Sequence, residues 1–218
     1  MRLRILRYSR EYQLTVFNVK TVFNRKELAE HLYRVVTSER FLGKLGLGNE
    51  VPFFICPFPA EYADMVEHDR QDLVTRADHA GVKVLDLSLY DLVLDILRER
   101  DILDQILEVE ANIEKSEFKE LLQGVFDPRA HLIPKIGAAI EAIPHDVIFL
   151  SGVGEVYPYI RSHNVLNNLQ STAKDAPTVL FFPGSYTHEL ATGASLDLFG
   201  RLHDDKYYRA FNILNYEV

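Results

Sequence analysis

The sequence predicts an α/β protein: a three-layer sandwich with a mostly parallel sheet and a helical insertion between the second and third strands. Two observations lead to this fold. Short apolar runs alternate along the chain with longer segments whose apolar residues recur at helical spacing. The apolar runs are also nearly continuous instead of alternating with polar residues, which is typical of strands buried on both faces by helices.

The N-terminal half is predicted to contain three helices and two strands. In the first helix, Leu28, Leu32 and Val35 lie on one face, and in the third, Asp91 is a plausible N-cap before a strong apolar stripe. Gly81 suits the left-handed end of the second helix. The predicted helices are 25–42, 61–80 and 91–110, and the predicted strands are 51–58 and 82–89.

The C-terminal half is predicted to contain two more strands among shorter helices. Pro158 fits the first turn of a helix, where a missing N–H costs nothing. Pro183 and Gly184 are expected to stop the last strand. The predicted helices are 116–126, 130–142 and 157–171, the strands are 146–150 and 178–182, and 195–218 should hold a short strand or turn and a helix at 207–211.

The size and composition are those of one soluble domain. The chain has 218 residues, 47% of them hydrophobic and 26% charged, and we divide it into a basic N-terminal extension, 1–24, and a single α/β domain, 25–218. The apolar runs are far shorter than the ~20 residues that span a bilayer, and the start lacks the continuous hydrophobic segment of a signal peptide. The single cysteine, Cys56, fits a reducing cytoplasm and should be a small buried side chain.

The charge is unevenly distributed. Residues 1–26 carry seven Lys or Arg against Glu11, a net charge of +6, and because the whole chain carries −8, residues 27–218 carry −14. Such an acidic body repels phosphate backbones, so we expect no tight DNA binding by the body. The basic N-terminal segment is either a solvated extension or a contact for an acidic partner or nucleic acid.

No catalytic motif accompanies these features. The turn at Gly152 and Gly154 precedes a helix and is a weak candidate for anion binding, but no P-loop lysine motif is present and Glu155 would repel a phosphate. A structural turn is the favoured interpretation. The eight histidines show no metal-binding spacing, so we expect no metal and no cofactor.

Polar residues are concentrated among aromatics and glycines between 151 and 211. For His163, a structural hydrogen-bonding role is favoured over a metal-binding or acid–base role. Of Asn167 and Asn168, at least one is expected to hydrogen-bond the backbone of a neighbouring loop, although an exposed polar face is an equal alternative. The guanidinium groups of Arg161 and Arg201 either fix the glycine turns to the sheet or bind a partner's carboxylate.

The same segments carry a family resemblance. The motifs SGVGEVYPYIRSHNVLNNL, VLFFPG, LDLFGRL and YYRAF, together with the earlier blocks GLGNEVPFFI and VLDLSLYDL, closely resemble the BrxB family of bacteriophage-exclusion (BREX) systems over 27–215. The resemblance implies a cytoplasmic component of a multi-protein system that methylates host DNA at non-palindromic sites and blocks phage replication. It implies no agreed catalytic activity, since the methyltransferase, the ATPase and the PglZ-type phosphatase-like protein are other components.

Two segments depart from the family pattern. Residues 1–24 look longer than the usual start, and 185–194 look longer than the tight glycine-rich turn expected there. No family role is therefore carried over to either segment.

Two functions follow as expectations. The first is a non-enzymatic assembly subunit that binds other BREX components, above all the PglZ-type protein, and no membrane. Its partner-facing residues would be Tyr157, Arg161, His163, Asn167, Asn168, Arg201, Tyr207, Tyr208 and Arg209. The alternative is a degenerate nucleotide-binding or hydrolysing domain that uses the turn from Gly152 to Gly154.

Overall fold

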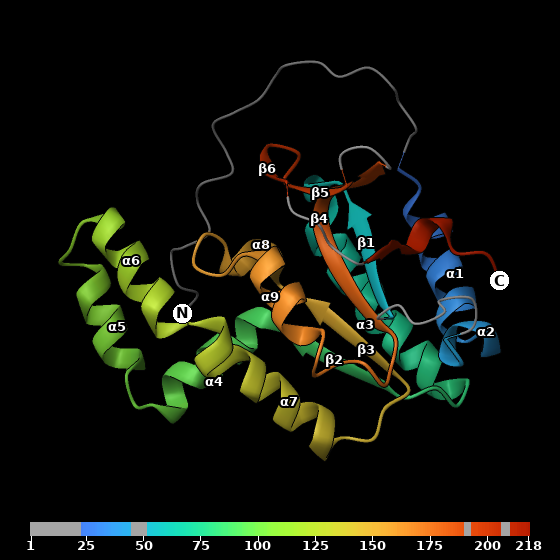
Figure 1. Ribbon diagram of the computed structural model, residues 1–218, viewed down its shortest axis with the longest axis horizontal. Helices are drawn as coiled ribbons and strands as arrows, with labels where there is room; N and C mark the ends of the chain where they lie inside the picture. The colour runs from blue at the N-terminus through green and yellow to red at the C-terminus, as the bar shows by residue number, and fades with distance from the viewer. Residues whose placement is uncertain (1–22, 45–51, 190–192, 206–209) are drawn as a thin grey trace.

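The computed structural model describes residues 23–44, 52–189, 193–205 and 210–218. A central sheet with the strand order β2-β3-β4-β1-β7 runs through the molecule, and each neighbouring pair in it is parallel (Figure 1). Its strands are β1 (Phe53–Phe58), β2 (Val84–Ser88), β3 (Val147–Ser151), β4 (Thr178–Glu189) and β7 (Phe211–Asn212). The predicted α/β class with a mostly parallel sheet is confirmed.

Helices cover both faces of this sheet. Along β1, Phe53 and Ile55 face one apolar core, whereas Phe54 and Cys56 face the other, because successive side chains of a strand point to opposite sides. One core is closed by α1 (Arg25–Val36), α2 (Glu39–Leu42) and α3 (Ala63–His79). The other is closed by α4 (Leu89–Glu99), α5 (Leu103–Glu110), α6 (Lys115–Val125), α7 (Ile133–Ala142), α8 (Val153–Val156) and α9 (Ser162–Leu169).

The single long helix predicted at 91–110 is in fact two helices, α4 and α5. The N-cap of α4 is Ser88, whose hydroxyl oxygen accepts a hydrogen bond from the Asp91 N–H at 3.2 Å, so Asp91 is not the cap. The chain leaves α4 through Asp101, which has a φ of +55°. The prediction was wrong because the apolar stripe continues across this turn, so periodicity alone does not reveal it.

β4 does not stop at Pro183 and Gly184, as the sequence suggested, but continues to Glu189. Pro183 opposes Phe58 in the last register pair between β4 and β1, and beyond it β4 pairs instead with β5 (Gly193–Leu198). The antiparallel β6 (Leu202–Asp205) extends this part of the sheet. A proline is tolerated there because its missing N–H falls where β4 changes partners.

Smaller outcomes concern other predicted features of the chain. The helix predicted at 25–42 is broken at Thr37, and Ser38 caps α2. The helix expected at 207–211 lies mostly outside the described residues, although Phe211 itself belongs to strand β7. Cys56 is fully buried, as predicted. None of the helices in the described ranges is long and apolar enough to cross a membrane.

Candidate functional site

The candidate residues gather where β3 and β4 end and α8 begins. Gly152 directly follows β3 and has a φ of +80°, a left-handed conformation that favours glycine. A Cβ atom on Gly152 would lie 3.1 Å from the Tyr90 nitrogen and 3.3 Å from the Leu89 nitrogen. The turn after β3 therefore packs directly on the first turn of α4, and a side chain would separate the two.

Close packing also accounts for the glycine at position 154. A Cβ atom there would lie 2.9 Å from the ring of Phe199 and 3.2 Å from the ring of Pro183. The N–H groups of Glu155 and Val156 donate hydrogen bonds to the Gly152 carbonyl oxygen, at 3.1 and 3.2 Å. Both glycines of the anion-site candidate thus have a packing role, and these two amides already donate within the first turn of α8.

Phe199 is the most informative residue of this region and was not singled out by the sequence. It is 40% exposed although it is large and aromatic, and its φ of +57° places it in the left-handed region, followed by Gly200 at +66°. That conformation costs a non-glycine residue about 1–3 kcal/mol and persists only where neighbouring contacts enforce it. The sequence signal was the bulky aromatic before glycine in LFGRL, between two short apolar runs.

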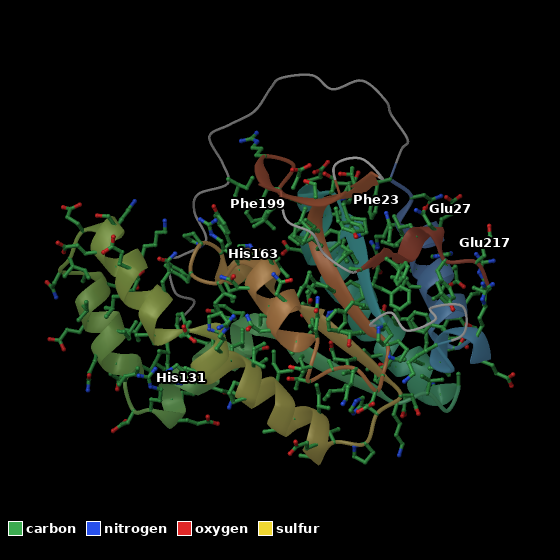
Figure 2. All side chains as sticks on the ribbon, viewed as in Figure 1. Phe23, Glu27, His131, His163, Phe199 and Glu217 are labelled. Carbon is green, nitrogen blue, oxygen red and sulfur yellow. The ribbon has the colours of Figure 1, made fainter. Side chains whose placement is uncertain are left out.

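Three hydrogen bonds and one ring contact hold Phe199 in place. Its N–H donates to the Pro183 carbonyl oxygen at 2.8 Å, and the next two N–H groups, of Gly200 and Arg201, return to Asp197 and Leu198 at 3.1 Å each. The ring meets Tyr157 edge to face with a centroid distance of 6.4 Å. Figure 2 labels Phe199 directly above His163 in that view.

We define the Phe199 surface by residues that the structure brings together around this turn. Tyr157 is half-buried behind the Phe199 ring, while Arg201 is exposed and Leu202 is 38% exposed. The surface therefore combines an aromatic pair with an exposed leucine and a guanidinium group. It consists of Tyr157, Phe199, Gly200, Arg201 and Leu202.

Arg161 lies in the same connecting segment as Tyr157. It is exposed at the start of α9, where its carbonyl oxygen accepts hydrogen bonds from the Asn164 and Val165 N–H groups, but its guanidinium group makes no hydrogen bond or ion pair with any residue that the structure describes. The idea that Arg161 fixes the Gly152 turn therefore has no support in the geometry. Its guanidinium group is left facing solvent.

His163 does not lie on the surface, contrary to the expectation that it faces a partner. It is only 5% exposed, because α9 turns it inward together with Val165, Leu166 and Leu169. A partner that binds the intact fold would not reach this side chain.

The two asparagines have different surroundings. Asn167 is exposed, which matches the exposed-face alternative. The Asn168 amide donates to the Asn164 carbonyl oxygen of its own helix at 2.6 Å, and its side-chain oxygen accepts from Arg129 at 2.9 Å. The expected bond to the backbone of a neighbouring loop is therefore replaced by one within α9 and one to a side chain.

The helix predicted at 157–171 also needs correction. The separate helix α8 ends at Val156, before the predicted range, and the helix within that range, α9, starts only at Ser162 and ends at Leu169. Pro158 lies between them, after a cis peptide bond, and its carbonyl oxygen accepts a hydrogen bond from Gln123 of α6 at 3.2 Å. Pro158 thus belongs to a turn and not to the first turn of a helix.

Three of the predicted partner-facing residues are not covered by the described structure. Tyr207, Tyr208 and Arg209 fall outside the described residues. Among the residues that are described, no three His, Cys, Asp or Glu side chains are grouped so as to hold a metal ion.

Comparisons with known proteins place this chain in a family. The family model described as BREX protein BrxB matches residues 85–213. A BREX protein BrxB of Bacillus cereus (strain H3081.97) is 31% identical over 195 residues, which cover 87% of this chain and 97% of that protein. This chain belongs to the BrxB family.

A second BrxB relative shows the same relationship. The BREX protein BrxB of Escherichia coli O9:H4 (strain HS) is 26% identical over 181 residues, covering 82% of this chain and 86% of that protein. The BrxB range 85–213 includes both the Gly152 turn and the Phe199 surface. No solved structure matches the chain significantly.

Proposed function

We propose that this chain is a non-enzymatic assembly subunit of a BREX antiviral defence system and that it binds the PglZ-type component through the Phe199 surface. Membership of the BrxB family makes it a component of such a system. The observation that carries the finer proposal is the conformation of Phe199: a large, exposed aromatic side chain held in a strained turn.

The Phe199 surface has the physical properties of a binding anchor. Aromatic and arginine side chains dominate the binding free energy of protein interfaces. The turn hydrogen bonds and the Tyr157 ring hold Phe199 in one conformation before binding, which lowers the entropy lost on association. Arg161 and Arg201, both exposed, add guanidinium groups suited to carboxylates of a partner.

A single substitution tests this role with little risk to the fold. Phe199→Gly removes the ring and also relieves the left-handed strain, so we expect a melting temperature within about 2 °C of the parent. Binding of the co-expressed PglZ-type protein, measured per folded molecule, should weaken about 30-fold, equivalent to ~2 kcal/mol. Arg161→Ala should weaken the same complex without lowering the melting temperature.

Met65→Ala is the matched control for the Phe199 variant. Met65 is a large apolar side chain on α3 and is 49% exposed, comparable to Phe199 but across the sheet. It should leave the complex unchanged. The Phe199 surface would be excluded as the anchor if Phe199→Gly bound the PglZ-type protein as tightly as the parent does. It would also be excluded if Phe199→Gly and Met65→Ala lost the same amount of affinity.

The enzyme alternative has its own test. A nucleotide-binding role would need the turn from Gly152 to Gly154, where the glycines are instead occupied by packing against α4 and Phe199. We therefore expect no magnesium-dependent binding of labelled ATP or GTP to the purified protein. Tight magnesium-dependent binding of either nucleotide to the folded protein would favour the degenerate nucleotide-binding domain.

A further inference from the structure

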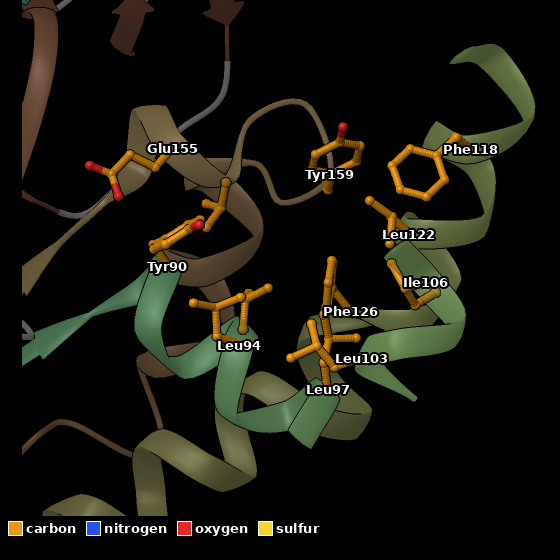
Figure 3. A pocket seen from close by; sticks show the side chains of 12 residues that line it. Tyr90, Leu94, Leu97, Leu103, Ile106, Phe118, Leu122, Phe126, Glu155 and Tyr159 are labelled. Carbon is orange, nitrogen blue, oxygen red and sulfur yellow. The ribbon is translucent and has the colours of Figure 1, made fainter. Parts of the chain in front are cut away.

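A second feature, separate from the Phe199 surface, is an apolar groove between α4, the α5–α6 hairpin and the α8–α9 turn (Figure 3). Tyr90 and Leu94 line one side of it, and Figure 3 shows Ile106 and Leu122 on the other. Phe118 and Tyr159 meet edge to face at a centroid distance of 6.4 Å. The groove is lined by apolar and aromatic side chains, together with Glu155.

The size of the groove limits what it can bind. Its cavity measures about 30 Å³, whereas pockets for small molecules and cofactors are roughly 300–1,000 Å³. There is room for the end of one apolar side chain, which suits a docked peptide segment better than a metabolite.

The border of the groove is acidic. Residues 89–126, which contain α4, α5 and α6, hold ten Asp or Glu and four Lys or Arg, a net charge of −6. Glu110 lies one turn after Ile106 on α5, and Glu114 lies one turn before Phe118, whose N–H donates to the Glu114 carbonyl oxygen at 2.9 Å. Residues one turn apart in a helix share a face, so the Glu110 carboxylate lies on the Ile106 side of α5 beside the groove, and Glu114 is the exposed N-cap residue of α6.

The electrostatics of Tyr159 agree with this placement. Burial raises the pKa of the Tyr159 hydroxyl, and the negative charge of Glu110 raises it further. Glu110 is therefore close enough to act on a ring that lines the groove. An apolar groove with such a border favours an apolar segment that carries Lys or Arg.

The chain itself contains a segment of this chemistry. Residues 1–22 carry Arg2, Arg4, Arg7, Arg10 and Lys20 against one glutamate, a net charge of +4. Apolar side chains are interleaved with these charges: Leu3, Ile5, Leu6 and Tyr8. By contrast, residues 27–218 carry −14.

The length of this segment is sufficient. The described structure begins at Phe23, whose ring contacts Tyr62 at a centroid distance of 4.8 Å, and Figure 1 shows α1 and the α5–α6 hairpin at opposite ends of the molecule. Twenty-two residues can span up to about 70 Å, against a radius of gyration of about 17 Å for a domain of this size. Attachment to the same chain also supplies an effective concentration on the order of mM.

We propose that residues 1–22 bind in this groove of their own chain. An apolar side chain of the RLRILRY stretch occupies the cavity, and its arginines pair with Glu110 and Glu114. While bound, this segment prevents other basic, apolar segments from using the groove.

Disulfide trapping in the full-length chain tests the proposal. Leu94→Cys in the groove is combined with Leu3→Cys or Leu6→Cys in the N-terminal segment, and intrachain disulfides formed under mild oxidation are quantified by mass spectrometry. Cys56 does not compete, because it is fully buried and burial raises the pKa of its thiol to about 12. Thr75→Cys, exposed on α3 at the other face of the sheet, replaces Leu94→Cys in the control.

At least one N-terminal position should react with the groove cysteine ten-fold or more faster than with the control cysteine. Glu110→Lys combined with Glu114→Gln should lower that rate about ten-fold, while Asp78→Lys with Glu141→Lys, at exposed positions away from the groove, should not. Equal rates at groove and control positions for both N-terminal cysteines would overturn the proposal. So would disulfides formed between two chains, which would assign the groove to a second copy.

Discussion

At the scale of single residues, close packing decides where glycine is required. Gly184 lies in β4 opposite Leu198 of β5, and a Cβ atom there would overlap the Asp197 carbonyl oxygen. The obstacle is backbone, which cannot rotate away as a side chain can. Gly124 in α6 has nothing within 4 Å of the same position.

These two glycines give opposite predictions for the same substitution. Gly184→Ala should lower the free energy of unfolding by about 2 kcal/mol or more, because β5 must shift. Gly124→Ala should raise it by about 1 kcal/mol, since alanine is the better helix former and meets no neighbour. Urea denaturation of both variants measures the difference. A neutral Gly184→Ala would show that β4 and β5 are not packed this closely.

Close packing between distant residues also fixes the position of Phe199, a candidate functional residue. Its ring rests on Gly154, which is 45 positions earlier in the sequence, and against Tyr157. Nothing in the local sequence predicts either contact. The strained φ of Phe199 and its exposure become informative only once these neighbours are known.

At the scale of elements, one hydrogen bond joins the antiparallel part of the sheet to its edge. The Tyr186 hydroxyl of β4 donates to the Ala210 carbonyl oxygen, directly before β7, at 2.6 Å. Burial raises the pKa of this hydroxyl to about 12. Because the pKa in the folded protein lies above the usual value of ~10, this contribution to stability is complete below pH 10 and is lost as the pH rises towards 12.

Tyr186→Phe tests this contribution. At pH 8 the variant should be less stable than the parent by about 1 kcal/mol, the net value of a typical hydrogen bond. This difference should shrink between pH 10 and 12, because only the parent loses stability through Tyr186 ionisation. Denaturation of both proteins across this range measures it, with Tyr62→Phe as the control that keeps the ring beside Phe23. A constant difference up to pH 12 would contradict the prediction.

At the scale of the whole molecule, the folded body includes residues before position 25. The ring of Phe23 packs on Tyr62, and the Asn24 side chain accepts a hydrogen bond from the Glu27 N–H at 3.3 Å as the N-cap of α1. Two residues assigned to the N-terminal extension by their sequence therefore contribute to the fold.

Two truncated proteins, one lacking residues 1–22 and the other lacking 1–24, test the contribution of Phe23 and Asn24. Removing 1–22 should keep cooperative unfolding, with a melting temperature within about 4 °C of the full chain. Removing 1–24 should cost a further ~1 kcal/mol or more, because α1 loses its cap and Tyr62 loses a ring contact. Thermal melts of both proteins measure this. Equal melting temperatures for the two truncated proteins would show that Phe23 and Asn24 do not stabilise the fold.

The sequence by itself determined the class of fold and the family. Apolar runs and helical periodicity are local properties, so they predict the parallel sheet, the helices on both faces and the burial of Cys56. The motifs that carry the BrxB resemblance are also written directly in the chain. These inferences need no knowledge of which distant segments meet.

The tertiary structure alone decided the candidate surface and the element boundaries. Ser88 rather than Asp91 caps α4, β4 continues through Pro183, and His163 turns inward while Phe199 turns outward. Each of these outcomes depends on a contact between residues far apart in sequence, or on a side chain competing for one backbone group. The local sequence pattern does not predict which side chain forms such a contact, because the packing of the whole fold decides it.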